Sequence, residues 1–87
     1  MIVQRTEDRT LAVEEVKPAT LVIVARQASG SIDRSYIVEF GYGGPTLLPH
    51  GSCCGIPISD LSAIIERLDD LKNLCYTTFP LHWENRE

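Results

Sequence analysis

The sequence has few cysteines, no long apolar run and no leader-like start, and each absence narrows the class of protein. Three cysteines are too few, and odd in number, for a disulfide framework, which favours a reducing compartment. The longest aliphatic run, Leu21 to Ala25, is far shorter than the about 20 residues that a membrane helix needs. Residues 1–8 lack the apolar core and the cleavage site of a signal peptide. We therefore expect a cytoplasmic protein without membrane contacts.

Basic residues are also scarce. Eight Lys and Arg residues stand against twelve Asp and Glu residues, and the net charge is −4. Because phosphate contacts dominate affinity for nucleic acid, this balance disfavours a nucleic-acid ligand. A chain of 87 residues forms one domain and buries only roughly 60% of its unfolded surface, so its core is small. Self-association is a common remedy for a small core, and we expect a homodimer.

Alternating apolar residues predict strands at 10–16, 20–27 and 35–42, with weaker signals at 1–4 and 46–48. The segment 20–27 is apolar on both faces, so it should lie at the centre of the sheet with both faces covered. A short Gly/Ser-rich link joins it to the next strand, which favours antiparallel pairing. The sequence therefore predicts a small antiparallel sheet of three to four strands within residues 1–58.

An amphipathic helix is predicted after the sheet, at about 60–74, with Ser59 as its N-cap and Asp60 at the positive end of its dipole. Its apolar stripe should face the core or a dimer partner and consists of Leu61, Ile64, Leu68 and Leu71. The tail, 75–87, is apolar enough to dock on the domain. The whole chain, 1–87, is then one α+β domain in which a single helix follows the sheet.

A single helix covers only one face of a sheet, so the other face needs a different partner. That free face carries either the Val22/Val24 row or the Tyr36/Phe40 row. A second copy of the chain would bury it, which is the main reason to expect a homodimer.

The segment from Gly41 to Ser59 has no charged residue, five glycines and three prolines. Such a segment is costly to expose unless it packs on the domain or against a partner. We expect the contact surface here and on the adjoining strand, with the binding residues Tyr36, Phe40, Tyr42, Leu47, Leu48 and His50. The alternative is that the segment completes the core, since interface and core share composition.

Three sets of residues resemble chemical sites. Gly41 to Pro45 is rich in glycine but lacks the spacing and the Lys-Ser/Thr pair of a phosphate-binding loop. Imidazole and thiolate ligands suit zinc, and the candidate set is His50, Cys53, Cys75 and His82. A nucleophilic pair would combine Cys53 or Cys54 with one of the histidines. The candidate zinc ligands match no common zinc motif, and nothing in the sequence brings a cysteine and a histidine of the nucleophilic pair together. We therefore expect no metal, no cofactor and no enzyme.

A resemblance rests on the strand segments 21–26 and 35–42, on an amphipathic helix, and on a motif formed by Leu47, Pro49, Gly55, Ile56 and Ile58. Over about 21–71 the chain resembles the positive-cofactor-four family of transcriptional coactivators. The resemblance implies a curved antiparallel sheet, one helix, dimerisation through the helices, and single-stranded nucleic acid bound on the sheet. His50, Ser52, Cys53 and Cys54 stand where that family has positive charge. Aromatic residues that could stack on bases remain in this chain.

Three functions follow in order of preference. The first is a small non-catalytic regulator that acts through protein–protein contacts, such as a phage-type inhibitor of a larger machine, of which anti-CRISPR proteins are an example. The net negative charge and the charge-free segment favour it. The second is a coactivator-like dimer that binds single-stranded nucleic acid. The third is a zinc- or thiol-dependent protein.

Overall fold

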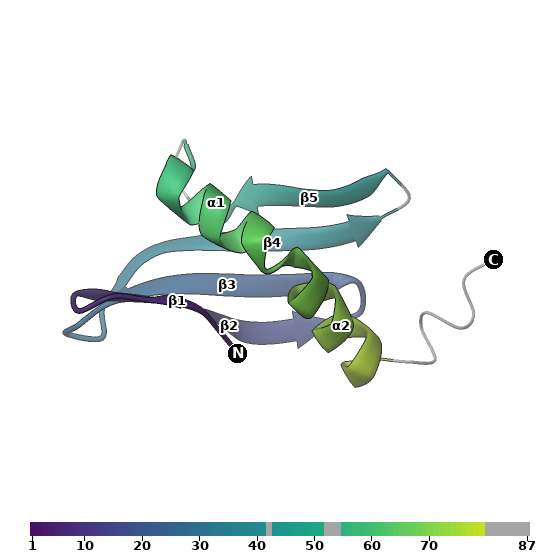
Figure 1. Cartoon of the computed structure of the whole chain (residues 1–87), viewed down its shortest axis with the longest axis horizontal. Coiled ribbons are helices and arrows are strands. Elements are labelled where there is room, and N and C mark those ends of the chain that lie inside the picture. Colours follow the sequence, from purple (N-terminus) through teal and green to yellow (C-terminus); the bar gives the residue numbers. More distant parts are fainter. Residues whose placement is uncertain (42, 52–54, 80–87) are drawn as a thin grey trace.

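A computed structural model of the chain describes residues 1–41, 43–51 and 55–79. The elements in chain order are β1 (Ile2–Arg5), β2 (Arg9–Lys17), β3 (Thr20–Gln27), β4 (Ile32–Gly41), β5 (Gly44–Pro49), α1 (Ile58–Glu66) and α2 (Leu68–Thr78). The five strands lie side by side in sequence order and form one antiparallel sheet with β3 at its centre. Both helices cross one face of this sheet diagonally (Figure 1).

The prediction of three to four strands and one helix is wrong, because the protein has a five-stranded half-barrel sheet followed by two helices. The helical segment is interrupted at Arg67, whose backbone angles (φ −110°, ψ 15°) leave the helical range. No glycine or proline marks this break in the sequence. The second helix also continues past the predicted end at residue 74 and reaches Thr78.

Both helices are short, with nine residues in α1 and eleven in α2. Within the described part of the chain, no helix combines the length and the apolar character that crossing a membrane requires.

The curvature of the sheet follows from irregularities in three of its strand pairs. The register shifts between Ile2 and Gln4, between Val13 and Glu15, and between Ala25 and Arg26. Bulges of this kind bend a strand and increase its twist, so the edge strand β1 curls toward the helices (Figure 1). There the Nη1 atom of Arg67 donates a hydrogen bond of 3.2 Å to the carbonyl oxygen of Ile2.

The core lies between the concave face of the sheet and the helices. Alternation along β3 and β4 directs one set of side chains toward α1 and α2, as the period of two requires. The main core residues on the strands are Leu11, Leu21, Ile23, Ala25, Tyr36, Val38 and Phe40. The helices contribute Ala63, Ile64, Leu71 and Cys75.

The opposite, convex face carries the other row of apolar residues. Cross-strand pairing places Val22, Ile37 and Leu48 directly beside one another, and Leu48 is 46% exposed. Val24 on the same face is only 6% exposed. The register places Val24 opposite Ala12, and Arg26 and Glu14, which form an ion pair (Nε–Oε2, 2.6 Å), flank this position on the two strands. The free face is therefore the one with the Val22/Val24 row.

Candidate functional site

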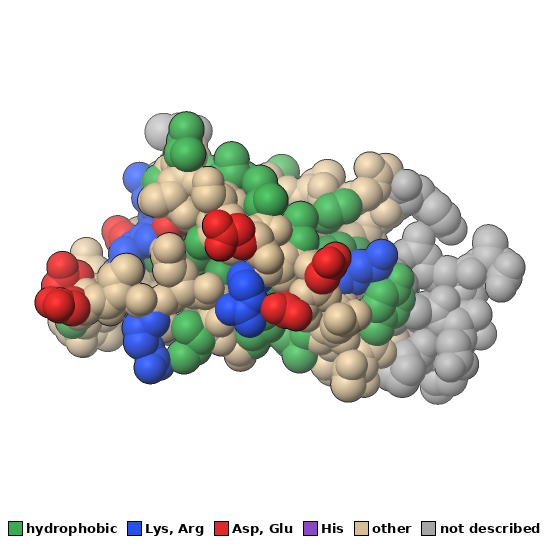
Figure 2. All heavy atoms as spheres, viewed as in Figure 1, with side chains coloured by type: hydrophobic (Ala, Val, Ile, Leu, Met, Phe, Trp, Pro, Cys, Tyr) green, Lys and Arg blue, Asp and Glu red, His purple; other side chains and the backbone are tan. Residues whose placement is uncertain are grey.

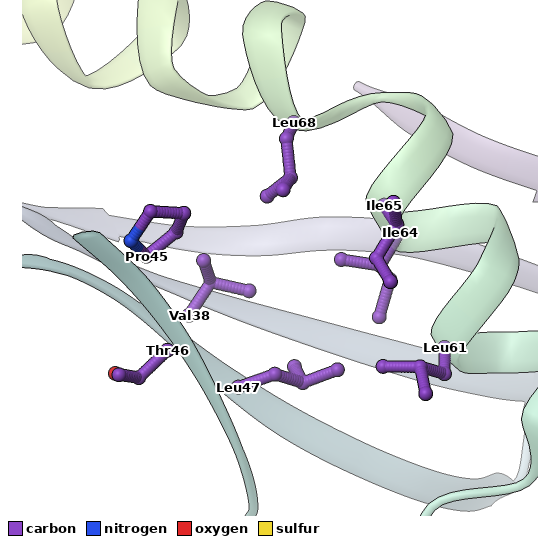
Figure 3. A pocket seen from close by; sticks show the side chains of 8 residues that line it. All are labelled: Val38, Pro45, Thr46, Leu47, Leu61, Ile64, Ile65 and Leu68. Atoms are coloured by element: carbon purple, nitrogen blue, oxygen red, sulfur yellow. The ribbon is translucent and has the colours of Figure 1, made fainter.

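An open apolar groove of about 460 Å³ lies between α1 and the strands β4 and β5. Its lining residues are Val38, Pro45, Thr46, Leu47, Leu61, Ile64, Ile65 and Leu68. In Figure 3, Leu47 from β5 and Leu61 from α1 point toward one another across the groove. Leu68 points into it from the start of α2.

The strands and the helix build different parts of this groove. Val38 is buried in β4 and forms the floor, while Pro45 and Leu47 form a wall on β5. Leu61, Ile65 and Leu68 form the facing wall. The lining contains no titratable side chain, so its chemistry is that of an apolar contact surface.

The helical wall continues onto the surface of the molecule. Ile65 is 55% exposed, and Ile58, two turns earlier on the same side of α1, is 77% exposed. In Figure 2, hydrophobic side chains form a band over α1 and toward β5, with acidic side chains beside it. Large exposed side chains on one short helix are unusual unless another surface covers them.

The free edge of β5 carries two prolines. His50 donates its backbone N–H to the Ser35 carbonyl oxygen (2.9 Å), and in an antiparallel pair the bonded positions alternate. Pro45 and Pro49 therefore direct their nitrogens away from β4, where a proline costs the sheet no hydrogen bond. Within β5 this leaves Leu47 as the only residue that presents an N–H group to the open edge.

Of the predicted binding residues, the structure places Leu47 in the groove and Leu48 on the convex face. His50 is exposed at the end of β5, on the same convex face. Tyr36 and Phe40 are buried in the core, with exposures of 1% and 5%, so they are not available to a partner in this structure. Tyr42 lies outside the described residues.

The predicted helical stripe divides into two parts. Ile64 and Leu71 are buried against the sheet, as expected for core residues. Leu61 and Leu68 are half-buried and line the groove instead.

A buried polar cluster anchors the start of α1. Asp60 has no solvent exposure and accepts two hydrogen bonds from Arg9, at 2.5 Å and 2.8 Å. The hydroxyl of Tyr36 donates a third hydrogen bond to Asp60, at 2.5 Å. Arg9 also donates through Nε to Asp33, at 2.8 Å. The predicted N-cap role of Ser59 is wrong, since α1 begins at Ile58 with Pro57 as the cap residue.

The cluster shifts the pKa values of its members. The hydrogen bonds from Arg9 hold the pKa of Asp60 below its ordinary value, against the effect of burial. Burial first, and then the hydrogen bond to Asp60, raise the pKa of Tyr36 to about 12. The hydrogen bond to Asp60 also raises the pKa of Arg9. All three groups therefore keep their ordinary charge states at neutral pH, which is the behaviour of a structural cluster.

The predicted zinc ligands do not come together in the described residues. Cys75 is buried on the side of α2 that faces the sheet, near the backbone of Thr20. This burial raises the pKa of its thiol. Thr20 pairs with Glu39 on β4, whereas His50 pairs with Ser35, which lies four residues from Glu39 on the same strand. That separation is about 13 Å along the sheet, and His50 is on the other face. Cys53, Cys54 and His82 lie outside the described residues, and no cluster of metal-binding side chains occurs in the rest.

Sequence reasoning missed the roles of Asp60, Arg9 and Ile65. Asp60 occupies the same helical side as Ala63 and Ile64, and its place in an apolar stripe is the signal of a buried carboxylate. Its partner Arg9 is 51 residues away in the chain, and no pattern in the sequence links the two. Ile65 extends the apolar stripe around the helix toward the groove.

Comparison of the chain with protein-family models, with curated proteins and with solved structures gives no match. The fold and the groove therefore define the protein only as a small α+β domain with an antiparallel sheet, two helices and an open apolar groove.

Proposed function

We propose that this chain is a small non-catalytic protein-interaction module whose docking surface is the groove between α1 and β5. The observation that carries the proposal is that Ile65 is 55% exposed beside a groove without a titratable side chain. Apolar pockets of this kind take up the anchor side chains of a partner, which dominate the binding energy of protein interfaces. The proposal replaces the predicted contact row of Tyr36 and Phe40 by residues of α1 and β5.

The charges of the described residues support a protein partner over nucleic acid. Arg9 is engaged by Asp60 and Asp33, Arg26 by Glu14, and Arg67 by Asp70. Arginines held by carboxylates contribute little to phosphate binding, which depends on released counterions. The net charge of −4 and the charge-free segment 41–59 favour an inhibitor that docks on a larger machine, such as the anti-CRISPR proteins of phages, as the form of this function.

A photo-crosslinking residue at position 65 tests the proposal in the cells that the protein comes from. The matched control carries the same residue at position 32, because Ile32 has a similar exposure of 59% and lies on β4 away from α1. We expect one discrete adduct to another protein from position 65, mapped to one contiguous segment of that partner, and no adduct to another protein from position 32. Equal adducts at both positions, or none, would contradict the proposal.

Retention on single-stranded DNA tests the coactivator-like alternative. Binding that weakens steeply with salt, and that is unchanged by Ile65→Ser, would favour nucleic acid over a protein partner.

A further inference from the structure

Helix α1 has two apolar sides, and only one of them packs on the sheet. Ala63 and Ile64 face the core. Ile58, Leu61 and Ile65 form a second stripe with spacings of three and four residues, and this stripe faces the groove and solvent. A stripe with this spacing is the seam along which one helix packs against another.

Two exposed acids, Glu66 and Asp69, lie at the C-terminal end of this second stripe. Glu66 follows Ile65 in the chain, and Asp69 comes one turn later, beyond the break at Arg67; both acids are exposed. The one basic residue between Ile58 and Asp69 is Arg67, and its guanidinium is held by Asp70 at 2.9 Å. A partner that lies along the stripe therefore meets negative charge at this end, and basic residues there would be attracted to it.

The other wall of the groove disfavours a strand as the occupant. An extended segment adds to a sheet edge through a row of backbone hydrogen bonds. Pro45 and Pro49 remove two of the three outward donors of β5 in this stretch, because the outward positions are 45, 47 and 49. The edge of β5 thus offers an occupant side-chain contacts but few backbone bonds.

We propose that the occupant is an amphipathic α-helix of another protein, with apolar residues at three-four spacing and with lysine or arginine along its outer flank. It lies alongside α1 and places its apolar side chains between Ile65 and Leu47. This inference rests on the proposed function, since it names the class of partner that the same groove receives. The basic flank pairs with Glu66 and Asp69.

Three synthetic peptides of about 18 residues, long enough to be helical alone, test the inference by titration against the full chain. The first has leucines at three-four spacing and lysines elsewhere, the second has glutamates in place of lysines, and the third has the composition of the first in scrambled order. We expect the first peptide to bind at least tenfold more tightly than the other two. Equal binding of the scrambled peptide would show a charge effect alone and would overturn the inference.

Two pairs of protein variants locate the binding. Ile65→Ser should weaken binding of the lysine peptide at least tenfold, and Ile32→Ser, a control of similar exposure, should leave it unchanged. Glu66→Lys should weaken the lysine peptide severalfold and strengthen the glutamate peptide. If Glu66→Lys changes neither, the basic flank is wrong.

The outcomes also separate this inference from the function on which it rests. Failure of all peptides together with a discrete protein adduct from position 65 would overturn the helical partner and leave the docking groove standing. Failure of both experiments would overturn both. The chain could instead self-associate, with Ile65→Ser dissociating the oligomer and the lysine peptide failing to compete. In that case a second copy of the chain is the occupant of the groove, and the inference is overturned as well.

Discussion

Asp60 at the start of α1 and Arg9 at the start of β2 form a two-fold hydrogen-bonded ion pair, and Asp60 has no exposure to solvent. The pair joins residues 51 positions apart and fixes the beginning of the helical segment over the sheet. A fully buried carboxylate has lost its hydration, and the attraction to its partner offsets this unfavourable free energy. Without the partner, the desolvation penalty remains and nothing offsets it.

Removal of Arg9 should therefore be strongly destabilising. We expect Arg9→Ala to lower the free energy of unfolding by about 3–5 kcal/mol, as for other broken buried pairs. Chemical denaturation measures this, and Arg26→Ala is the control, because its pair with Glu14 is on the surface. A loss from Arg9→Ala no larger than that from Arg26→Ala would contradict the anchoring role.

The same pair makes stability depend on pH in the acid range. The pKa of Asp60 is lower in the folded chain than its unfolded value of about 3.9. The unfolded chain then takes up a proton first, so the stabilisation from Asp60 is present above about pH 4 and is lost as pH falls through the folded pKa. We expect the difference in unfolding free energy between the wild type and Asp60→Asn to shrink as pH falls from 5 to 2, measured by urea denaturation. A difference that stays constant would exclude this linkage.

Residues of the two sides of the helical segment should respond differently to truncation. Leu71 is fully buried, and Leu71→Ala should cost about 2–5 kcal/mol of unfolding free energy. Ile65 is mostly exposed, and Ile65→Ala should cost less than about 1 kcal/mol. Thermal or urea unfolding measures both. Should Ile65→Ala destabilise the chain as much as Leu71→Ala, the groove is part of the core.

Cys75 should be chemically inert in the native protein. Its thiol is buried and its pKa is raised by burial, so the reactive thiolate is scarce. In a variant whose other two cysteines are replaced by serine, we expect a thiol reagent to label Cys75 only at the rate of unfolding. Labelling within the mixing time at neutral pH would point to a reactive thiol and favour the thiol-dependent alternative.

The convex face of the sheet should bind a second copy of the chain. Val22, Ile37 and Leu48 lie side by side there, and the neighbouring end of the face carries both Lys17 and Glu39. A border with charges of both signs can face its own copy without net repulsion. We expect a homodimer in sedimentation experiments at micromolar concentration, and we expect Leu48→Glu to shift it to monomer.

Ile58→Glu is the control for this dimer, because Ile58 is exposed on α1 at the opposite face. Dissociation by Ile58→Glu and not by Leu48→Glu would move the interface to the helix. A protein that is monomeric at all concentrations would contradict the predicted homodimer.

The local pattern of the sequence predicted the centre of the sheet well. The strand expected at 20–27 matches β3, and its alternation gives the two faces, because the pleat leaves no other arrangement of neighbouring side chains. The edge strand β5 was reduced to a short signal at 46–48 because of its two prolines. Prolines weaken a strand prediction in general, and only the pairing with β4 shows that both nitrogens point outward here.

The helix break and the groove depend on tertiary contacts that no local pattern contains. Arg67 is an ordinary helix former by propensity, and its backbone leaves the helix where its side chain reaches Ile2 and Asp70. The burial of Tyr36 and Phe40 was undecided in the sequence, since either face of β4 could have met the helices. The helices lie over Tyr36, and its hydroxyl bonds to Asp60.

The contact between Arg67 and Ile2 has a consequence for the order of events during synthesis. Ile2 is synthesised 65 positions before its partner Arg67, and Arg9 is synthesised 51 positions before Asp60. Long-range closures of this kind slow folding, because the chain must lose loop entropy before the contact forms. Until the helical segment has been synthesised, the nascent sheet exposes Leu21, Ile23 and Phe40. A chaperone that recognises apolar surface can bind the chain during this interval.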